Sequence, residues 1–246
     1  MNDIDQKADF DLRRRQVLAL LGASGAALLA GRAPAQSGSA RATDGNLPAC
    51  RVTPAQTEGP YFVDERLNRS DLRVDPADGS VRAGVPLLLE LRVSSMSRAG
   101  CTPLAGAVVD LWHCDAVGIY SDATDPSFNT IGKQFLRGYQ VTDQQGGVQF
   151  TTIYPGWYRG RTVHLHFKVR AKARSGRSNE FTSQLYFDDA ITDRVQAHPL
   201  YASRGQRTLK NDGDGLFREG GSQLMLALVE SGHGYAATFD VGLQMT

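Results

Sequence analysis

The sequence predicts an all-β protein, a β-sandwich with long loops and little helix. Eight short runs are rich in branched and aromatic residues, as half-buried strands are. Clusters of Gly, Asp, Asn and Pro separate these runs, as turns do in a sandwich. A single short segment carries a helical pattern. With 246 residues, 41% apolar residues and a net charge of +1, we expect one globular domain, or at most two, and no nucleic-acid partner.

The predicted strands come in the order 85–93, 107–115, 135–143, 147–155, 161–171, 181–188, 223–231 and 237–244. The stretch TDQQGGVQF (142–150) predicts a hairpin, with Gly146 and Gly147 supplying the positive φ of its turn. The polar region from Asp189 to Gly221 predicts one short helix, over 189–198. So long a connection is uncommon in a compact domain and indicates a functional segment.

The N-terminus resembles a twin-arginine export signal, predicted over residues 1–35. Arg14 and Arg15 precede an apolar run over 17–30, and Ala33-Pro34-Ala35 forms a small-x-small cleavage site. The alternative is an ordinary Sec signal. A run of 14 residues is too short to span about 30 Å of hydrocarbon, and no later segment resembles a membrane span. We therefore expect a periplasmic or secreted protein.

Cleavage after Ala35 would leave 246 − 35 = 211 residues. Residues 36–47 predict a disordered leader, because they are polar, rich in Gly and Ser and without periodicity. The folded domain is then expected over 48–246. Since twin-arginine export carries folded proteins, the signal favours a bound metal.

Three cysteines remain after the signal, so at least one has no partner in the chain. Cys50 and Cys101 flank predicted strands in loop-like stretches, whereas Cys114 lies in the apolar stretch VVDLWHCDA. We expect a disulfide between Cys50 and Cys101 and a buried thiol at Cys114. The alternative is that no disulfide forms.

The segment WYRGRTVHLHF (157–167) carries a candidate metal site. His164 and His166 share one face of a predicted strand, about 7 Å apart along it, and Tyr158 lies six residues upstream. A tyrosine with a free pKa near 10 becomes a ligand at neutral pH only beside a strongly charged cation. Phenolate and imidazole together suit ferric iron better than zinc or copper(I). Tyr120 is the best candidate for a further hard ligand.

Other side chains in these stretches have simpler interpretations. His113 is expected to be a hydrogen-bonded core histidine, although a zinc or copper site formed by His164 and His166, with or without His113, stays an alternative. Both tryptophans, Trp112 and Trp157, are expected to be packing residues. The two remaining histidines are expected at the surface, His198 and His233.

Six ordered motifs together resemble a known family. They are TEGPYF (57–62), LWHCDAVGIYSD (111–122), FLRGYQVTDQQGGVQFTTIYPGWY (135–158), RTVHLHFKV (161–169), TSQLYFDD (182–189) and YASRGQRTLKNDGDGLF (201–217). In this order they resemble the intradiol ring-cleavage dioxygenases, above all the exported, single-chain members that carry WHCDA. Those enzymes insert both atoms of O₂ between the hydroxyl-bearing carbons of a catechol, which gives a cis,cis-muconate-type diacid. The likeness extends over about residues 48–243.

The resemblance implies a role for each matching residue. Non-haem Fe(III) would be bound by two phenolates and two imidazoles, those of Tyr120, Tyr158, His164 and His166. Tyr158 would also act as a base, Arg161 would lie beside the bound ring and Gln184 behind the ligands. The substrate mouth would be lined by Gly59, Pro60, Tyr61 and Arg161. The resemblance implies a small aromatic diol and O₂ as partners.

Which catechol is the substrate, and how many chains assemble, stay open. The chain carries neither the N-terminal helical dimerisation region of the catechol-specific members nor a signal for a partner chain. The alternative function is a non-catalytic, prealbumin-like or carbohydrate-binding sandwich that binds aromatic or sugar ligands in the same cleft.

Overall fold

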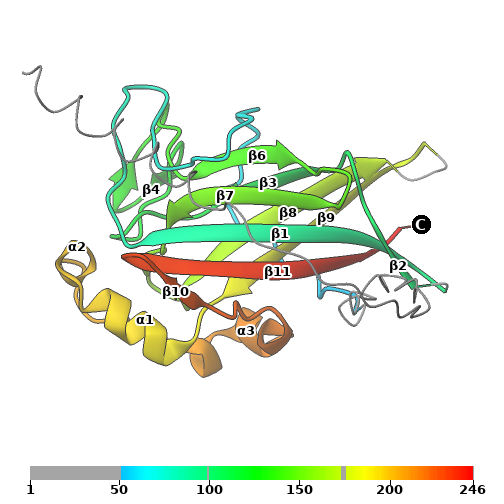
Figure 1. The fold of residues 1–246 in the computed structure, drawn as a ribbon. Helices are drawn as coiled ribbons and strands as arrows, with labels where there is room; N and C mark the ends of the chain where they lie inside the picture. The colour runs from blue at the N-terminus through cyan, green and yellow to red at the C-terminus, as the bar shows by residue number, and fades with distance from the viewer. Residues whose placement is uncertain (1–50, 99, 173–175, 246) are drawn as a thin grey trace, which may run out of the picture. The chain divides into compact units, whose positions relative to one another are not determined.

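Two β-sheets pack face to face in the computed structural model, which describes residues 51–98, 100–172 and 176–245 (Figure 1). The predicted signal over 1–35, the leader over 36–47 and Cys50 lie outside the described residues. The β-sandwich expected from the sequence is confirmed.

The first sheet is built around one long strand, β1. Strand β11 pairs with β1 in parallel, β10 pairs with β11, and β2 and β7 pair with the two ends of β1 in antiparallel. The bounds are β1 Pro86–Ser97, β2 Gly100–Pro103, β7 Gly147–Ile153, β10 Val229–Ser231 and β11 Gly234–Gln244.

The second sheet is antiparallel and has the order β6-β3-β8-β9. A separate two-stranded ribbon, β4 and β5, follows β3 in the chain. The bounds are β3 Val108–Trp112, β4 Thr124–Asp125, β5 Phe128–Asn129, β6 Arg137–Val141, β8 His164–Lys172 and β9 Ser178–Tyr186.

Short helices follow β9, and two of them, α1 (Asp189–Gln196) and α3 (Gly215–Arg218), are drawn below β10 and β11 in Figure 1. The predicted helix is confirmed as α1 (Asp189–Gln196), and the Asp188 carboxylate caps it by accepting from the amides of Ala190 and Ile191. The others are α2 Pro199–Ala202 and α3 Gly215–Arg218, with 3₁₀ turns η2 Asn211–Gly213 and η3 Gly221–Gln223. In the part of the chain that the structure describes, no helix has the length and apolar character needed to cross a membrane.

The main core lies between the two sheets, because alternate residues of each strand point inward. From β1 it receives Leu87, Leu89, Leu91 and Val93, and from β8 it receives Leu165, Phe167 and Val169. Complete burial of such a side chain contributes about 1.5–3 kcal/mol. The opposite face of β8 carries the histidines, so the core fixes the strand whose other face forms the candidate site.

Two sequence expectations are wrong in detail. Over 223–231 only the last three residues form a strand; Leu224 and Leu226 are buried, and Met225 makes a single bridge to Tyr186. The segment crosses the end of β9 instead of pairing along it, so its apolar residues fill the core without forming a ladder.

The stretch 142–150 is not a hairpin. A turn forms there, but β6 and β7 belong to different sheets. Gly146 has φ +76°, whereas Gly147 is not in the positive-φ region. The Gly146 carbonyl accepts from the Val93 amide at 2.8 Å, so the turn passes the β1 strand and directs β7 onto it.

Candidate metal centre

The outer face of β8 brings the two predicted histidines beside three other aromatic or polar side chains. Residues paired across antiparallel strands project from the same face of the sheet. His166 pairs with Trp112 on β3 and with Gln184 on β9, and His164 pairs with Tyr186. Both histidines are buried, at 1% and 2% exposure, because the rings of Trp112, Tyr120 and Tyr158 pack on the imidazoles.

The imidazoles converge at their Nε2 atoms, which lie 3.1 Å apart. His164 Nδ1 donates to the carbonyl of Thr162 at 2.7 Å, which leaves its Nε2 lone pair free to bind an electrophile. The same Nε2 lies 3.1 Å from the Tyr158 hydroxyl and 3.4 Å from Arg161 Nη1. One lone pair therefore faces three polar groups, more than hydrogen bonding alone can satisfy.

The two predicted tyrosines complete the cluster from two loops. Tyr120 is 1% exposed, and its ring centroid lies 5.7 Å from that of Tyr158 and 6.3 Å from that of His166. Its hydroxyl makes no hydrogen bond with any described residue. The structure thus brings together all four side chains expected from the sequence to be ligands.

A tight turn before Tyr120 packs against the loop that carries Trp157 and Tyr158. Asp115 Oδ1 accepts from the amides of Val117 and Ile119, and Gly118 adopts φ +84°. A Cβ at Gly118 would lie 2.2 Å from the carbonyl oxygen of Trp157. Only glycine permits this contact between backbones, and the contact places Tyr120 beside Tyr158.

Burial keeps all four groups neutral in the protein without a metal. Desolvation raises the pKa of Tyr120 and Tyr158 far above the ordinary value, and it lowers the pKa of His164 and His166 well below theirs. The nearby guanidinium of Arg161 lowers the pKa of His164 further. Neutral imidazoles are the form that binds metals, while the phenols need a multivalent cation to ionise.

The donor set fits a hard trivalent metal. Two nitrogens that bind one ion at about 2 Å lie roughly 3 Å apart when the angle between the two bonds is near 90°. The distance between the two Nε2 atoms, 3.1 Å, agrees with this spacing. The unpartnered Tyr120 hydroxyl belongs to a ring that lies in the same cluster. Two phenols and two imidazoles are the ligands that suit ferric iron. Within the described residues, no group of three or more His, Cys, Asp or Glu side chains could hold a metal instead.

Arg161 lies at the edge of the cluster and is tied in place on two sides. Its Nε donates to the Asp214 carboxylate at 2.9 Å, and its Nη2 donates to Gln184 Oε1 at 2.6 Å. Gln184 Nε2 in turn donates to the carbonyl of Thr57 at 2.9 Å. Both predicted residues therefore contact the cluster or a side chain that does. Tyr186 donates to Gln56 Oε1 at 2.6 Å and closes this network.

Besides Arg161, two of the three other residues predicted to line the substrate mouth lie against the four clustered side chains. A Cβ on Gly59 would lie 3.4 Å from His166 Cε1. The Tyr61 ring stacks on Tyr120 at a centroid distance of 4.5 Å, and its hydroxyl donates to Asp125 at 3.1 Å. Pro60, between them, is exposed. The segment thus covers the four clustered side chains from outside the sheet.

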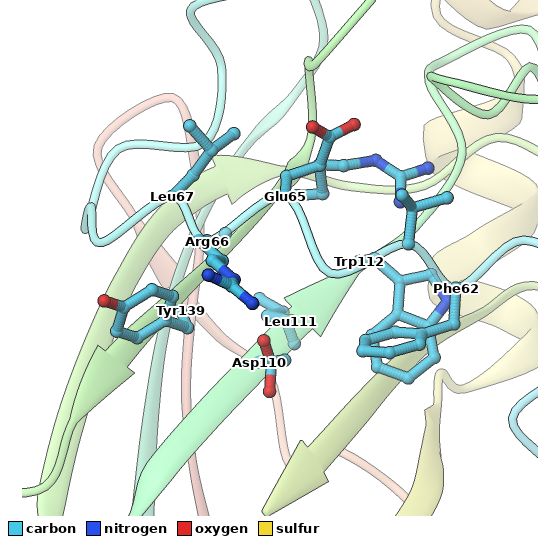
Figure 2. A pocket seen from close by; sticks show the side chains of 11 residues that line it. Phe62, Glu65, Arg66, Leu67, Asp110, Leu111, Trp112 and Tyr139 are labelled. Carbon is cyan, nitrogen blue, oxygen red and sulfur yellow. The ribbon is translucent and has the colours of Figure 1, made fainter. Parts of the chain in front are cut away.

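Trp112 packs between the cluster and a small neighbouring pocket, as expected for a packing residue. Its indole stacks on His166 at 5.0 Å, and Phe62 packs on it at 4.8 Å. Figure 2 shows Phe62 beside the indole of Trp112, with Asp110 and Leu111 on the strand that carries it. None of the four clustered side chains lines this pocket. Trp157 also packs in the core and donates to the Gly205 carbonyl at 3.1 Å.

His113 is confirmed as a hydrogen-bonded core histidine. Its Nδ1 donates to the Cys114 carbonyl at 2.8 Å, and its Nε2 accepts from the Thr152 hydroxyl at 2.7 Å. Both nitrogens are thus engaged away from the cluster, which contradicts a three-histidine zinc or copper site. Cys114 is a buried free cysteine, as expected, and His198 and His233 are exposed. The disulfide between Cys50 and Cys101 stays a prediction, because Cys50 lies outside the described residues.

We expect His113→Gln to reduce the amount by which the free energy of unfolding falls between pH 7 and pH 5. Burial lowers the pKa of His113 from 6.5 to about 4. Between these values the unfolded chain binds a proton that the folded protein does not, so stability falls as the pH falls. The wild type should therefore lose roughly 2 kcal/mol more than the variant between pH 7 and pH 5. Urea unfolding of both proteins at the two pH values measures this difference. Equal losses would contradict a neutral, buried His113.

Several site residues were not singled out from the sequence. Tyr186 could have been, because it lies on the same face of its strand as Gln184. Asp214 and Arg137 carry no local signal. Arg137 is 3% exposed, and its guanidinium donates to the carbonyls of Tyr61 and Ser121, so it holds the stacked tyrosines together. Only the fold reveals these partners.

Comparison with known proteins then gives one family. A family model described as Dioxygenase matches residues 57–212, which include the four clustered side chains. A chlorocatechol 1,2-dioxygenase from Pseudomonas putida is 28% identical over 164 residues, which is 59% of this chain and 57% of that protein. The chain belongs to the intradiol ring-cleavage dioxygenase family.

Solved structures agree with this assignment. The intradiol ring-cleavage dioxygenase from Tetranychus urticae is 29% identical with a TM-score of 0.68, over 79% of this family member and 95% of that chain. The dioxygenase domain of a dioxygenase carbohydrate-binding protein fusion from Streptomyces sp. SirexAA-E is 32% identical with a TM-score of 0.57, over 80% and 100%. This intradiol family member spans 57% and 58% of the length of two chlorocatechol 1,2-dioxygenases that it matches.

Proposed function

We propose that this protein is a non-haem iron(III) dioxygenase that cleaves a catechol-type ring between its hydroxyl-bearing carbons. With O₂, the product would be a cis,cis-muconate-type diacid that contains both oxygen atoms. The observation that carries the proposal is the convergence of one buried phenol, one half-buried phenol and two neutral imidazoles beside a fixed arginine. The named relatives, which include chlorocatechol and catechol 1,2-dioxygenases, support the substrate class.

Tyr120, Tyr158, His164 and His166 would hold the metal. Ferric iron would supply the positive charge that ionises the phenols and the diol and makes the bound ring reactive toward O₂. His164 presents its Nε2 because Thr162 accepts from its Nδ1. The ring nitrogens need no change of protonation to bind, since burial already keeps both imidazoles neutral.

The surrounding residues would handle protons and charge. Tyr158 Oη would accept a proton from one hydroxyl of the diol, because it lies at the edge of the cluster that faces Arg161. Arg161 is a permanent cation and would stabilise the negative charge that develops on the ring, an effect of several kcal/mol in preorganised sites. Tyr61 and Trp112 would exclude water, since they stack on Tyr120 and His166.

An oxygen electrode tests this function directly. Protein loaded with ferric iron should consume O₂ when catechol, protocatechuate, hydroxyquinol or a chlorocatechol is added. The muconate-type products should be detected by their ultraviolet absorption. Iron-loaded protein that binds each diol and consumes no O₂ would favour the alternative, a non-catalytic sandwich that binds aromatic or sugar ligands.

Tyr158→Phe is expected to change the colour and the turnover of the iron-loaded protein together. Tyrosinate-to-iron charge transfer should make the wild type burgundy, and the variant loses one phenolate and the proposed base at once. Visible absorption and O₂ uptake measure both effects. Tyr139→Phe is the matched control, because Tyr139 lies on β6 and outside the cluster. A variant with wild-type colour and turnover would contradict the ligand set.

We also propose export to the periplasm or the exterior, on the strength of the twin-arginine signal predicted over 1–35. Fractionation of cells, with Arg14 and Arg15 replaced by Lys as the control, tests it. Wild-type protein that stays in the cytoplasm would contradict export.

A further inference from the structure

Asp214 is a buried carboxylate that links a distant loop to the segment just before β8. It is 1% exposed. Its Oδ1 accepts from the amides of Leu216 at 2.8 Å and Phe217 at 3.4 Å, which caps α3. Its Oδ2 accepts from Arg161 Nε at 2.9 Å and from the amide of Thr162 at 2.8 Å. Each carboxylate oxygen therefore accepts two hydrogen bonds, Oδ1 from the α3 amides and Oδ2 from Arg161 and Thr162.

The contact with Asp214 fixes the orientation of the Arg161 guanidinium. A planar guanidinium held at Nε and at Nη2 cannot rotate without breaking one of the two hydrogen bonds. Here Asp214 holds Nε and Gln184 holds Nη2, at 2.9 and 2.6 Å. The remaining Nη1 then lies 3.4 Å from His164 Nε2, at the edge of the ligand cluster.

The same loop also fixes one of the histidines. Thr162 donates through its amide to Asp214 and through its hydroxyl to Asn211 Oδ1 at 2.7 Å. Its carbonyl accepts from His164 Nδ1 at 2.7 Å. The loop over 211–214 therefore holds the Arg161 guanidinium directly and the His164 ring through Thr162.

We propose that Asp214 is a positioning residue for ring cleavage, because it directs Arg161 toward the bound diol and steadies His164 through Thr162. This inference rests on the proposed function. Asp214 itself touches neither the four ligands nor the space beside them; it acts through Arg161 and Thr162.

Asp214→Asn tests the role with little change in volume. An asparagine has one acceptor and one donor end, so one of its ends must face donors only, whichever way the amide is turned. The expected result is a fall in kcat/KM of about 10–100-fold at equal iron content. Asp188→Asn is the matched control, since Asp188 caps α1 in the same way and lies on the exposed surface; it should keep wild-type kcat/KM.

A double-mutant cycle with Arg161→Met separates positioning from a merely structural role. If Asp214 acts mainly through Arg161, Asp214→Asn should cost clearly less in the Arg161→Met background than in the wild type, and what remains is the route through Thr162. A purely structural role would make the two losses multiply, which would overturn the inference. Should Asp214→Asn fail to fold, Asp214→Ser retains a capping acceptor and still removes the Arg161 contact, with the same expectations.

Anaerobic titration with catechol gives a readout that needs no turnover. The visible band of resting iron-loaded Asp214→Asn should match the wild type, because no phenol is touched. Its catechol complex should show a shifted band and a raised Kd. If the wild type consumes no O₂, the proposed function fails, while this titration still tests the positioning role. If the wild type turns over and Asp214→Asn behaves like Asp188→Asn, the inference fails and the function stands.

Discussion

Replacing Tyr120 with Phe is expected to stabilise the metal-free protein and to abolish its stabilisation by iron. The Tyr120 hydroxyl is buried and has no hydrogen-bond partner among the described residues. A buried hydroxyl without a partner costs about 1–3 kcal/mol, so its removal should raise the free energy of unfolding by about 1 kcal/mol. In iron-loaded protein the same change removes a proposed ligand. Ligand binding stabilises only the folded state, so the variant should lose most of the gain that iron gives the wild type.

Tyr154→Phe is the matched control. Tyr154 is also fully buried, but its hydroxyl donates to Thr192 Oγ1 at 2.7 Å. Loss of that hydrogen bond should lower stability by about 1 kcal/mol, with the response to iron unchanged. Urea unfolding of chelator-treated and iron-loaded proteins measures both variants. If Tyr120→Phe destabilises the metal-free protein as Tyr154→Phe does, or leaves the gain from iron intact, Tyr120 is not a ligand.

Gly118→Ala is expected to unfold the candidate site and to cost about 3 kcal/mol or more of stability. The new Cβ would lie 2.2 Å from the Trp157 carbonyl oxygen, and a backbone atom cannot move aside as a flexible side chain can. Relief requires the turn that carries Tyr120 to move away from the loop that carries Tyr158. Iron affinity should therefore fall together with stability.

A control at a second glycine, Gly79, distinguishes the effect of the steric clash from that of the positive φ. Gly79 has φ +74°, close to the +84° of Gly118, yet a Cβ there would meet nothing within 4 Å. Gly79→Ala should lose only about 1 kcal/mol, the cost of a left-handed alanine, and should bind iron normally. Unfolding in urea and iron titration compare the two. A Gly118→Ala variant as mild as Gly79→Ala would show that the contact between the loops does not position the tyrosines.

Local sequence predicted the fold class and half of the cluster for direct physical reasons. A period of two places His164 and His166 on one face of a strand, whatever that strand pairs with. Branched and aromatic runs bounded by turn residues predicted most strands of the sandwich, and α1 followed from its helical pattern. The donor chemistry also indicated Tyr158 and Tyr120 as candidates, and the resemblance of the ordered motifs supported both and added Arg161 and Gln184.

Local sequence patterns could not predict which distant segments pair with each other. The stretch over 142–150 has the residues of a hairpin turn, but β7 pairs with β1 because the Val93 amide binds the Gly146 carbonyl. The strand predicted over 223–231 is mostly absent, because Leu224 and Leu226 are buried at the end of β9. A backbone hydrogen bond between distant segments decided the first case, and side-chain packing decided the second.

By itself, then, the sequence determined which side chains share a strand face and which chemistry they can perform, since strand geometry and donor type are local properties. The tertiary structure alone decided that Tyr120 meets those histidines, and that Asp214 holds Arg161 across 53 residues of chain. The reason is physical: such contacts form only after the sandwich core has fixed the loops, and a carboxylate or a glycine carries no local mark of the distant group it will meet.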